Sequence, residues 1–278
     1  MANEHQLIID QYDGTVSVVN SLYKLIDNRY SDLFFAVIVH GSVATNEVIS
    51  YSDFDGLIII KDQYVNSKLI EEFRKESMKI ILKFDPLQHH GWFQIKESDL
   101  TNYPENYLPI SALKKSKLVY PKKSQIKLQL KVEQDVDYKS HLIKILDQFK
   151  KREDENWKPN NIYQLKSMLS QIMLIPCLYY SAKYEEGIFK RESFDAVRTD
   201  FSKEDWMPIE IASDIRKKWT YNISYPQRLL LQQSNKYIRK IATRFFSPRI
   251  PGFFQKEMNS EFYKNLKLLV AKIEKEIK

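Results

Sequence analysis

The chain has 278 residues, a formal net charge of +7 and a hydrophobic content of 43%. This length allows one large domain or two ordinary ones, and the apolar content excludes a largely disordered chain. The single cysteine, Cys177, excludes an intramolecular disulfide and gives no indication of a zinc cluster.

The N-terminal residues lack a basic stretch followed by a long apolar core, so no secretory signal is expected. No apolar run approaches the length that spans a bilayer, so we expect a cytoplasmic protein with no membrane partner. The positive charge, with a sequence pI of about 9.1, favours anionic partners such as nucleotides or RNA over a polycationic acceptor such as an aminoglycoside. Equally, the lysines can simply form a solvated surface.

The N-terminal part predicts an α/β arrangement. Apolar spacing predicts a helix over 15–28, and short apolar runs bounded by turn residues predict strands over 34–40 and 57–60. Helical spacing returns over 64–82, as expected of a helix that crosses back over a sheet. A third strand is predicted over 87–96, after Pro86 ends the helical register.

Two aspartates stand at the entrance of the second predicted strand. Asp53 and Asp55 are two residues apart, so both carboxylates point to one side of an extended chain. Two carboxylates that face one way repel each other unless a cation lies between them, and Mg²⁺ prefers such oxygen ligands and bridges to phosphates. The pair therefore indicates a magnesium site.

A glycine and a serine end the first predicted strand. Gly41 lets the backbone approach a ligand closely, and free N–H groups at such a turn bind anions. Ser42 adds a hydroxyl that reaches a phosphate oxygen. A phosphate cradle beside paired metal carboxylates is typical of phosphoryl or nucleotidyl transfer.

Gly41-Ser42, ten further residues and then Asp53-Phe54-Asp55 before an apolar strand resemble the signature of the DNA polymerase β-like nucleotidyltransferase superfamily. The likeness is greatest to its bacterial antibiotic and minimal nucleotidyltransferases, and Ser52 and Ala44 also fit. The motif covers about a tenth of the chain. The resemblance implies an NTP substrate, with ATP as the expected nucleotide, bound through Mg²⁺ and through Gly41, Ser42 and Ser52.

The resemblance also implies a third carboxylate on the third strand. Asp85 is the candidate, as a metal ligand or as the base that accepts the acceptor's proton, although it matches by position and precedes a proline. Glu97 and Asp99 fit less well. His89 and His90 are further candidates for a phosphate ligand or general base, against the alternative of a half-buried hydrogen-bonding histidine.

The C-terminal part predicts helices only. The periodicity predicts helices over 141–149, 162–184, 209–219, 226–246 and 262–277, with a kink at Pro176. In the superfamily a helical domain often meets the triphosphate, which makes Lys190 and Ser193 nucleotide-binding candidates and Lys166 a weaker one. The alternative for Ser193 is the N-cap of the following helix.

We therefore expect a small mixed-sheet nucleotidyltransferase domain over 1–120, closed by a short helix over 108–118. A basic linker over 121–138 and an all-helical domain over 139–278 follow, with the nucleotide between the domains. Three hypotheses remain for the activity: a small-molecule (antibiotic-like) nucleotidyltransferase, an enzyme that modifies RNA or protein, and a non-catalytic nucleotide-binding or antitoxin-like partner module. The intact Asp-x-Asp disfavours the third.

Overall fold

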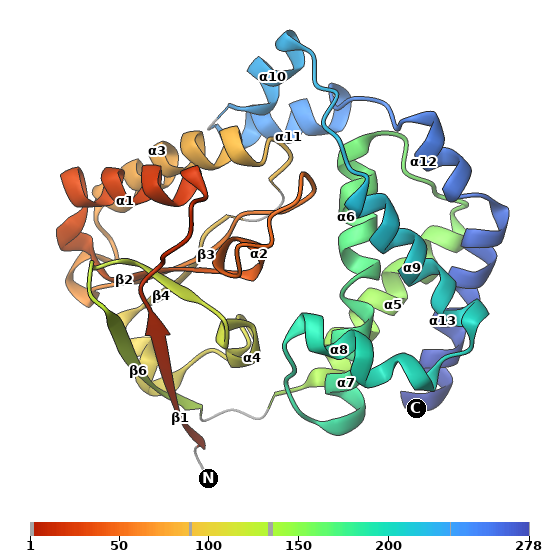
Figure 1. The fold of residues 1–278 in the computed structure, drawn as a ribbon, viewed down its shortest axis with the longest axis horizontal. Helices are drawn as coiled ribbons and strands as arrows, with labels where there is room; N and C mark the ends of the chain where they lie inside the picture. The colour runs from red at the N-terminus through yellow and green to blue at the C-terminus, as the bar shows by residue number, and fades with distance from the viewer. Residues whose placement is uncertain (1–2, 89–90, 133–135, 234, 278) are drawn as a thin grey trace. The chain divides into compact units, whose positions relative to one another are not determined.

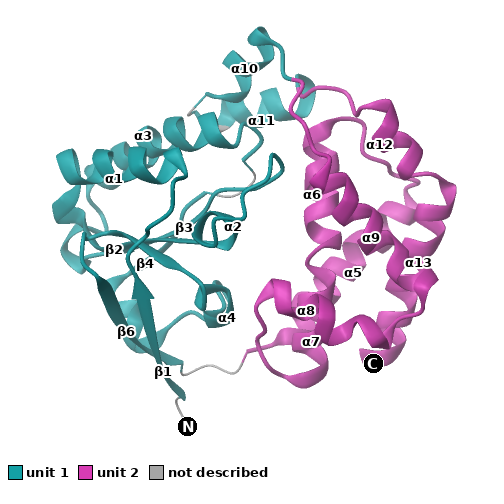
Figure 2. Ribbon diagram, in the orientation of Figure 1, with its two compact units in different colours: residues 1–135, 223–246 teal, residues 136–222, 247–278 magenta. Residues whose placement is uncertain are grey.

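The computed structural model describes residues 3–88, 91–132, 136–233 and 235–277 (Figure 1). The chain folds into two compact units, shown in different colours in Figure 2. Unit 1 consists of residues 1–135 and 223–246, and unit 2 of residues 136–222 and 247–278.

Unit 1 is built on a mixed four-stranded sheet in the order β4-β3-β2-β5. The central strands β2 (Phe34–His40) and β3 (Asp55–Ile60) are antiparallel and match the predicted strands closely. Strand β4 (Phe93–Lys96) pairs parallel with β3, and β5 (Lys117–Tyr120) pairs antiparallel with β2. A parallel pair needs a crossover, which the predicted helix supplies as α3 (Lys68–Phe84).

Successive side chains of the central strand β3 pack alternately into two separate hydrophobic cores, one on each face of the sheet. Ile58 and Ile60 pack with apolar residues of α1 (Ser17–Arg29) and α3 on one face of the sheet. Leu57 and Ile59 belong to the other core, together with residues of an antiparallel ribbon formed by β1 (Asn3–Asp10) and β6 (Gln125–Val132). The near-continuous apolar sequence of β3 therefore reflects burial on both faces.

Several predicted elements of unit 1 differ from the structure. The predicted linker 121–138 contains β6, which pairs along its whole length with β1. The predicted helix 108–118 is replaced by the short α4 (Ile110–Leu113) and the start of β5, because pairing with β2 decides the fate of this short segment. Of the predicted strand 87–96, the last four residues form β4, and the other residues of this range that the structure describes, 87–88 and 91–92, are not in a strand.

Residues 223–246, expected in the helical domain, belong to unit 1. They form α10 (Tyr225–Leu231) and α11 (Lys236–Phe245) in place of one long helix. The side-chain amide of Gln232, between the two helices, donates a hydrogen bond of 3.1 Å to the carbonyl of Leu82 at the end of α3.

Unit 2 consists mainly of helices. Its helices are α5 (Tyr138–Asp154), α6 (Ile162–Ile172), α7 (Ile175–Tyr184), α8 (Lys190–Val197), α9 (Lys203–Lys217), α12 (Gly252–Glu257) and α13 (Ser260–Ile277). The predicted kink at Pro176 is a full break, because the proline stands in the first turn of α7, where its missing N–H costs nothing. Within the described residues, none of the helices combines the length and apolar character that crossing a bilayer requires.

Candidate functional site

The β2–β3 hairpin brings together the two motifs found in the sequence. The strand register places His40, the last residue of β2, opposite Asp55, the first residue of β3. Gly41 follows His40 directly and opens the short helix α2 (Gly41–Ala44). Gly41 and Asp55, which are fourteen residues apart in the sequence, therefore meet at one end of the two central strands.

Gly41 is required here for two physical reasons. Its φ is +65°, in the left-handed region that side chains other than glycine rarely adopt. A Cβ atom on this residue would also lie 2.9 Å from Oδ2 of Asp55. The carboxylate therefore occupies the space that a side chain would fill, and the Gly-Ser turn approaches it directly.

The loop that leads into the two aspartates is closed by Ser52. Its hydroxyl accepts a hydrogen bond of 3.0 Å from the N–H of Ile49, and its own N–H donates to the Ile49 carbonyl at 2.9 Å. Ser52 is buried, while Asp53 and Asp55 are half-buried. Ser52 thus has a structural part in holding the entrance to β3.

Three residues that the sequence did not single out support the segment Asp53-Phe54-Asp55. The side-chain amide of the buried Gln88 donates to the carbonyl of Phe54 at 3.1 Å. The rings of Phe54 and Trp92 meet edge to face, with centroids 5.2 Å apart. A Cβ atom on Gly56 would lie 2.3 Å from the Trp92 ring, so Gly56 makes room for it. The glycine at position 56, directly after Asp55 and inside an apolar strand, was the sequence signal that another group approaches the backbone there.

Asp85 lies at the C-cap of α3, not on a strand, and is completely buried. Its Oδ1 accepts a hydrogen bond of 3.2 Å from the N–H of Leu87, so this carboxylate shapes its own turn. In the part of the chain that the structure describes, no three His, Cys, Asp or Glu residues form a group suited to a metal. His89 and His90 lie outside the described residues.

The nucleotide-binding candidates in unit 2, Lys190, Ser193 and Lys166, lie in α8 and α6. Lys190 is the first residue of α8, and the buried hydroxyl of Ser193 donates to the Lys190 carbonyl at 2.7 Å. The N-cap of α8 is Phe189, so the N-cap alternative for Ser193 is wrong. Lys166 on α6 is completely buried, and its Nζ lies 2.9 Å from the Tyr221 hydroxyl.

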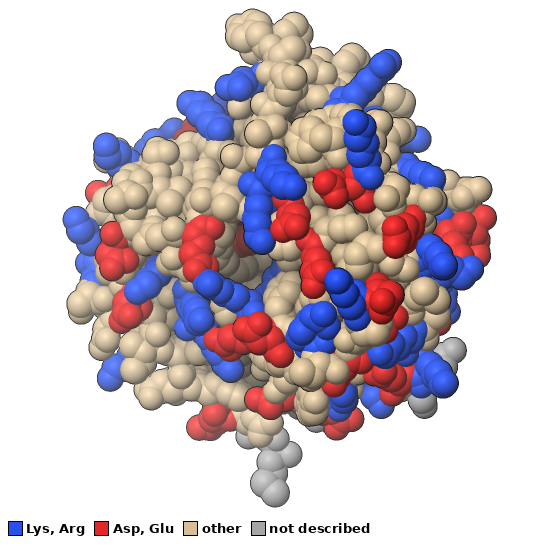
Figure 3. All heavy atoms as spheres, turned by 45° about the vertical axis from the view of Figure 1, so that its right-hand side comes forward, with Lys and Arg blue, Asp and Glu red and all other residues tan. Residues whose placement is uncertain are grey.

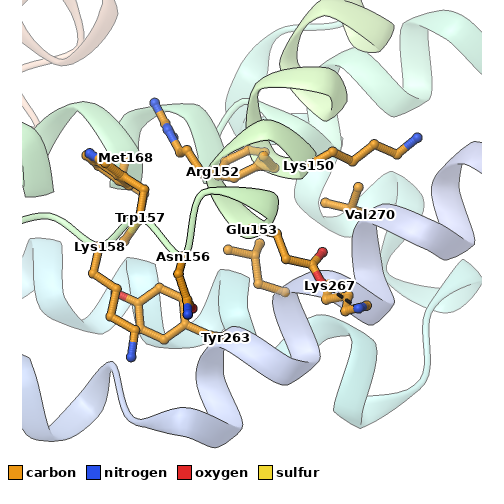
Figure 4. Close-up of a pocket in the computed structure, with 12 residues that line it drawn as sticks. Lys150, Arg152, Glu153, Asn156, Trp157, Lys158, Met168, Tyr263, Lys267 and Val270 are labelled. Carbon is orange, nitrogen blue, oxygen red and sulfur yellow. Dashed lines mark ion pairs between the residues drawn. The ribbon is translucent and has the colours of Figure 1, made fainter.

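Unit 2 also holds a pocket with a cavity volume of about 110 Å³ (Figure 4). Arg152 lies against two of its aromatic walls, 5.4 Å from the centroid of Phe149 and 4.8 Å from that of Trp157, and burial lowers the pKa of its guanidinium. Glu153 and Lys267 also line the pocket and form an ion pair with each other (Figure 4). None of the residues that the sequence singled out lines this pocket.

No protein-family model and no curated protein matches the chain. Among solved structures, the chain is similar to the spectinomycin adenyltransferase AAD(9) from Enterococcus faecialis, crystallised with ATP and spectinomycin. The match covers 83% of this chain and 100% of that chain, at 13% sequence identity and a TM-score of 0.42.

Proposed function

We propose that this chain is a nucleotidyltransferase that moves a nucleoside monophosphate from an NTP to an acceptor hydroxyl. The acceptor oxygen forms a bond to the α-phosphorus, the bond to the β-phosphate oxygen breaks, pyrophosphate leaves and the hydroxyl proton passes to a base. The observation that supports the proposal is the contact of Gly41 with Asp55 across the hairpin. This close approach of the Gly-Ser turn to the Asp55 carboxylate supports a site in which phosphate and a cation are bound side by side.

The residues present fit a magnesium ion. Asp53 and Asp55 offer the oxygen donors that Mg²⁺ prefers, and Mg²⁺ is commonly held by one or two carboxylates together with substrate phosphates. When bound, Mg²⁺ would supply neutralisation of the phosphate charge. Gly41 and Ser42 would hold the outer phosphates through the backbone and the Ser42 hydroxyl. Lys190, on α8 of unit 2, remains a proposed nucleotide contact, whereas the buried Ser193 hydroxyl donates to the Lys190 carbonyl within its own helix.

Asp85 is proposed as a positioning residue of this site. Its turn contains Gln88, whose amide holds the Phe54 carbonyl between the two aspartates. A change at Asp85 would therefore act on Asp53 and Asp55 through this segment. We expect Asp85→Asn to lower the free energy of unfolding, the rate of turnover, or both, while the affinity for ATP is largely kept.

The test is incubation of the chain with each labelled NTP, Mg²⁺ and cell extract. Asp53→Asn and Asp55→Asn should each reduce label transfer by more than about tenfold, because each removes a charge that stabilises the bound cation. The matched control is Asp27→Asn, which removes the same charge at an exposed position on α1. Transfer within about tenfold of wild type in both site variants would contradict the proposal.

The same experiment separates the three classes of function. Label that is lost with ribonuclease or protease identifies a macromolecular acceptor, and label in the low-molecular-weight fraction identifies a small molecule. Binding of ATP without transfer to any fraction would favour the non-catalytic module.

A further inference from the structure

The segment 223–246, here called the basic arm, carries a formal net charge of +5. Its sequence contains Arg228, Lys236, Arg239, Lys240 and Arg244 and neither aspartate nor glutamate. The arm is less than a tenth of the chain, yet its five cations compare with a formal net charge of +7 for the whole sequence. Such a concentration of one sign attracts an anionic surface.

The arm also exposes large apolar side chains. Tyr225 is 74% exposed on α10, and Tyr237 and Phe245 are 79% and 67% exposed on α11. The side chains of Leu229, Ile238, Ile241 and Phe246 are also exposed, to a smaller extent. At the top of Figure 3 the surface is mostly tan, the colour of all residues other than lysine, arginine, aspartate and glutamate.

The apolar and basic residues of α11 occupy different faces of the helix. Tyr237, Ile241 and Phe245 are spaced by four residues and therefore lie on one side. Lys240 and Arg244, both exposed, lie one position earlier in each turn, about 100° around the helix. A short helix with an apolar face beside a basic face has the character of a helix that lies in a membrane interface.

The two helices of the arm are specified locally. Ser224 and Gln227 cap the start of α10 reciprocally, and the side chain of Asn235 accepts from the N–H groups of Tyr237 and Ile238 at the start of α11. Leu231 is completely buried, and Gln232 is bonded to the end of α3. The arm is therefore a folded part of unit 1, and its large apolar side chains are exposed.

We propose that the basic arm docks on an anionic lipid surface, with the apolar face of α11 in the headgroup region and its cations at lipid phosphates. The mixture of exposed side chains favours lipid over RNA. Leu229, Ile238 and Ile241 have no ring with which to stack on a base, and exposed tyrosine and phenylalanine, as at Tyr237 and Phe245, are typical of helices that lie in a membrane interface. The ten residues of α11 extend only about 15 Å, so the arm lies on the bilayer and does not cross it. The earlier expectation of no membrane partner rested on spanning length alone.

The test is co-sedimentation of the full chain with vesicles of phosphatidylcholine, with and without about 30% phosphatidylserine. Wild type should pellet with the anionic vesicles and much less with the neutral ones. Ile241→Asp/Phe245→Asp should weaken binding at least about tenfold, since each change removes an inserted apolar side chain. Leu69→Asp/Leu268→Asp, at helix positions 43% and 44% exposed outside the arm, should change it less than about twofold.

A second pair of variants tests the charge. Arg228→Gln/Lys240→Gln should weaken binding about fivefold per cation, and Lys75→Gln/Lys79→Gln on α3 should have a smaller effect. Circular dichroism confirms that each variant is folded.

The proposal is overturned if wild type stays in the supernatant at about 1 mM anionic lipid, or if arm and control variants behave alike. A chain that binds RNA but no vesicle, with the apolar substitutions silent, would assign the arm to nucleic acid. Concentration-dependent dimers abolished by Ile241→Asp, with no vesicle binding, would assign it to a second copy of the chain.

Discussion

At the scale of single residues, Gly41 gives the most direct test of the site geometry. Gly41→Ala should lower the free energy of unfolding by about 1–2 kcal/mol, because φ is +65° and the new Cβ meets the Asp55 carboxylate. It should also weaken ATP binding, since Asp55 must move.

The matched control for this change is Gly252→Ala at the start of α12, where a Cβ atom meets nothing within 4 Å. That variant should be neutral, or more stable by up to about 1 kcal/mol. Urea unfolding and calorimetry with ATP measure both effects. Unchanged stability and ATP affinity in Gly41→Ala would contradict the close approach.

Glu105 provides a pH-dependent test within unit 1. Burial raises the pKa of the Glu105 carboxyl, although the N–H of Ile110, 2.8 Å from Oε2, partly offsets this. Because the pKa is higher in the folded than in the unfolded state, the stability contributed by this group is complete below the unfolded pKa and is lost as pH rises through the folded pKa.

Glu105→Gln removes this titration and keeps an oxygen for Ile110. The Tm difference between Glu105→Gln and wild type should therefore become more favourable to the variant as pH rises from about 4 towards 7. Thermal unfolding at several pH values measures it, with Glu4→Gln at an exposed position of β1 as the control. A Tm difference that does not change with pH would show that the surroundings of Glu105 do not disfavour its charged form.

At the scale of elements, α9 depends on the capping box at its N-terminus. The N–H of Asp205 donates to the Ser202 hydroxyl at 3.1 Å, and the N–H of Ser202 donates to the Asp205 carboxylate at 3.2 Å. Lys272 of α13 also lies 3.2 Å from this carboxylate and ties the cap to a second helix.

Ser202→Ala should therefore cost about 1 kcal/mol of unfolding free energy, with a range of about 0.5–2 kcal/mol. Ser213→Ala, inside the same helix, should change stability by less than about 0.5 kcal/mol. Urea unfolding of the two variants side by side measures the difference. Equal stabilities would mean that the cap is not formed in solution.

At the scale of the whole molecule, the charge of +7 predicts salt-dependent binding to polyanions. Binding to bulk tRNA should weaken by about tenfold or more between about 50 and 200 mM salt, because each neutralised phosphate releases a counterion. Fluorescence anisotropy over this salt range measures the slope. Absence of binding, or binding that is insensitive to salt, would shift the expected acceptor towards a small molecule.

The sequence by itself determined the features that depend on near neighbours. The apolar runs of β2 and β3, the turn at Gly41 and the paired aspartates were recognisable because each is encoded within a few residues. A kink at Pro176 was predicted from the proline itself, and the structure shows a full break between two helices there. The residues of the candidate site in unit 1 that local sequence encodes therefore lie within one short stretch of the chain.

The tertiary structure decided the features that depend on distant partners. Strand β6 pairs with β1 from Asn3 opposite Val132 onward, a register that no local pattern encodes, so its residues resembled a polar linker. Asp85 has the carboxylate of a metal ligand, but it lies at the C-cap of α3, where it accepts a hydrogen bond from the N–H of Leu87 and stabilises the turn after the helix. Periodicity specifies that an element forms and which face is apolar, whereas the pairing partner and the buried surroundings are set by contacts between residues far apart in the chain.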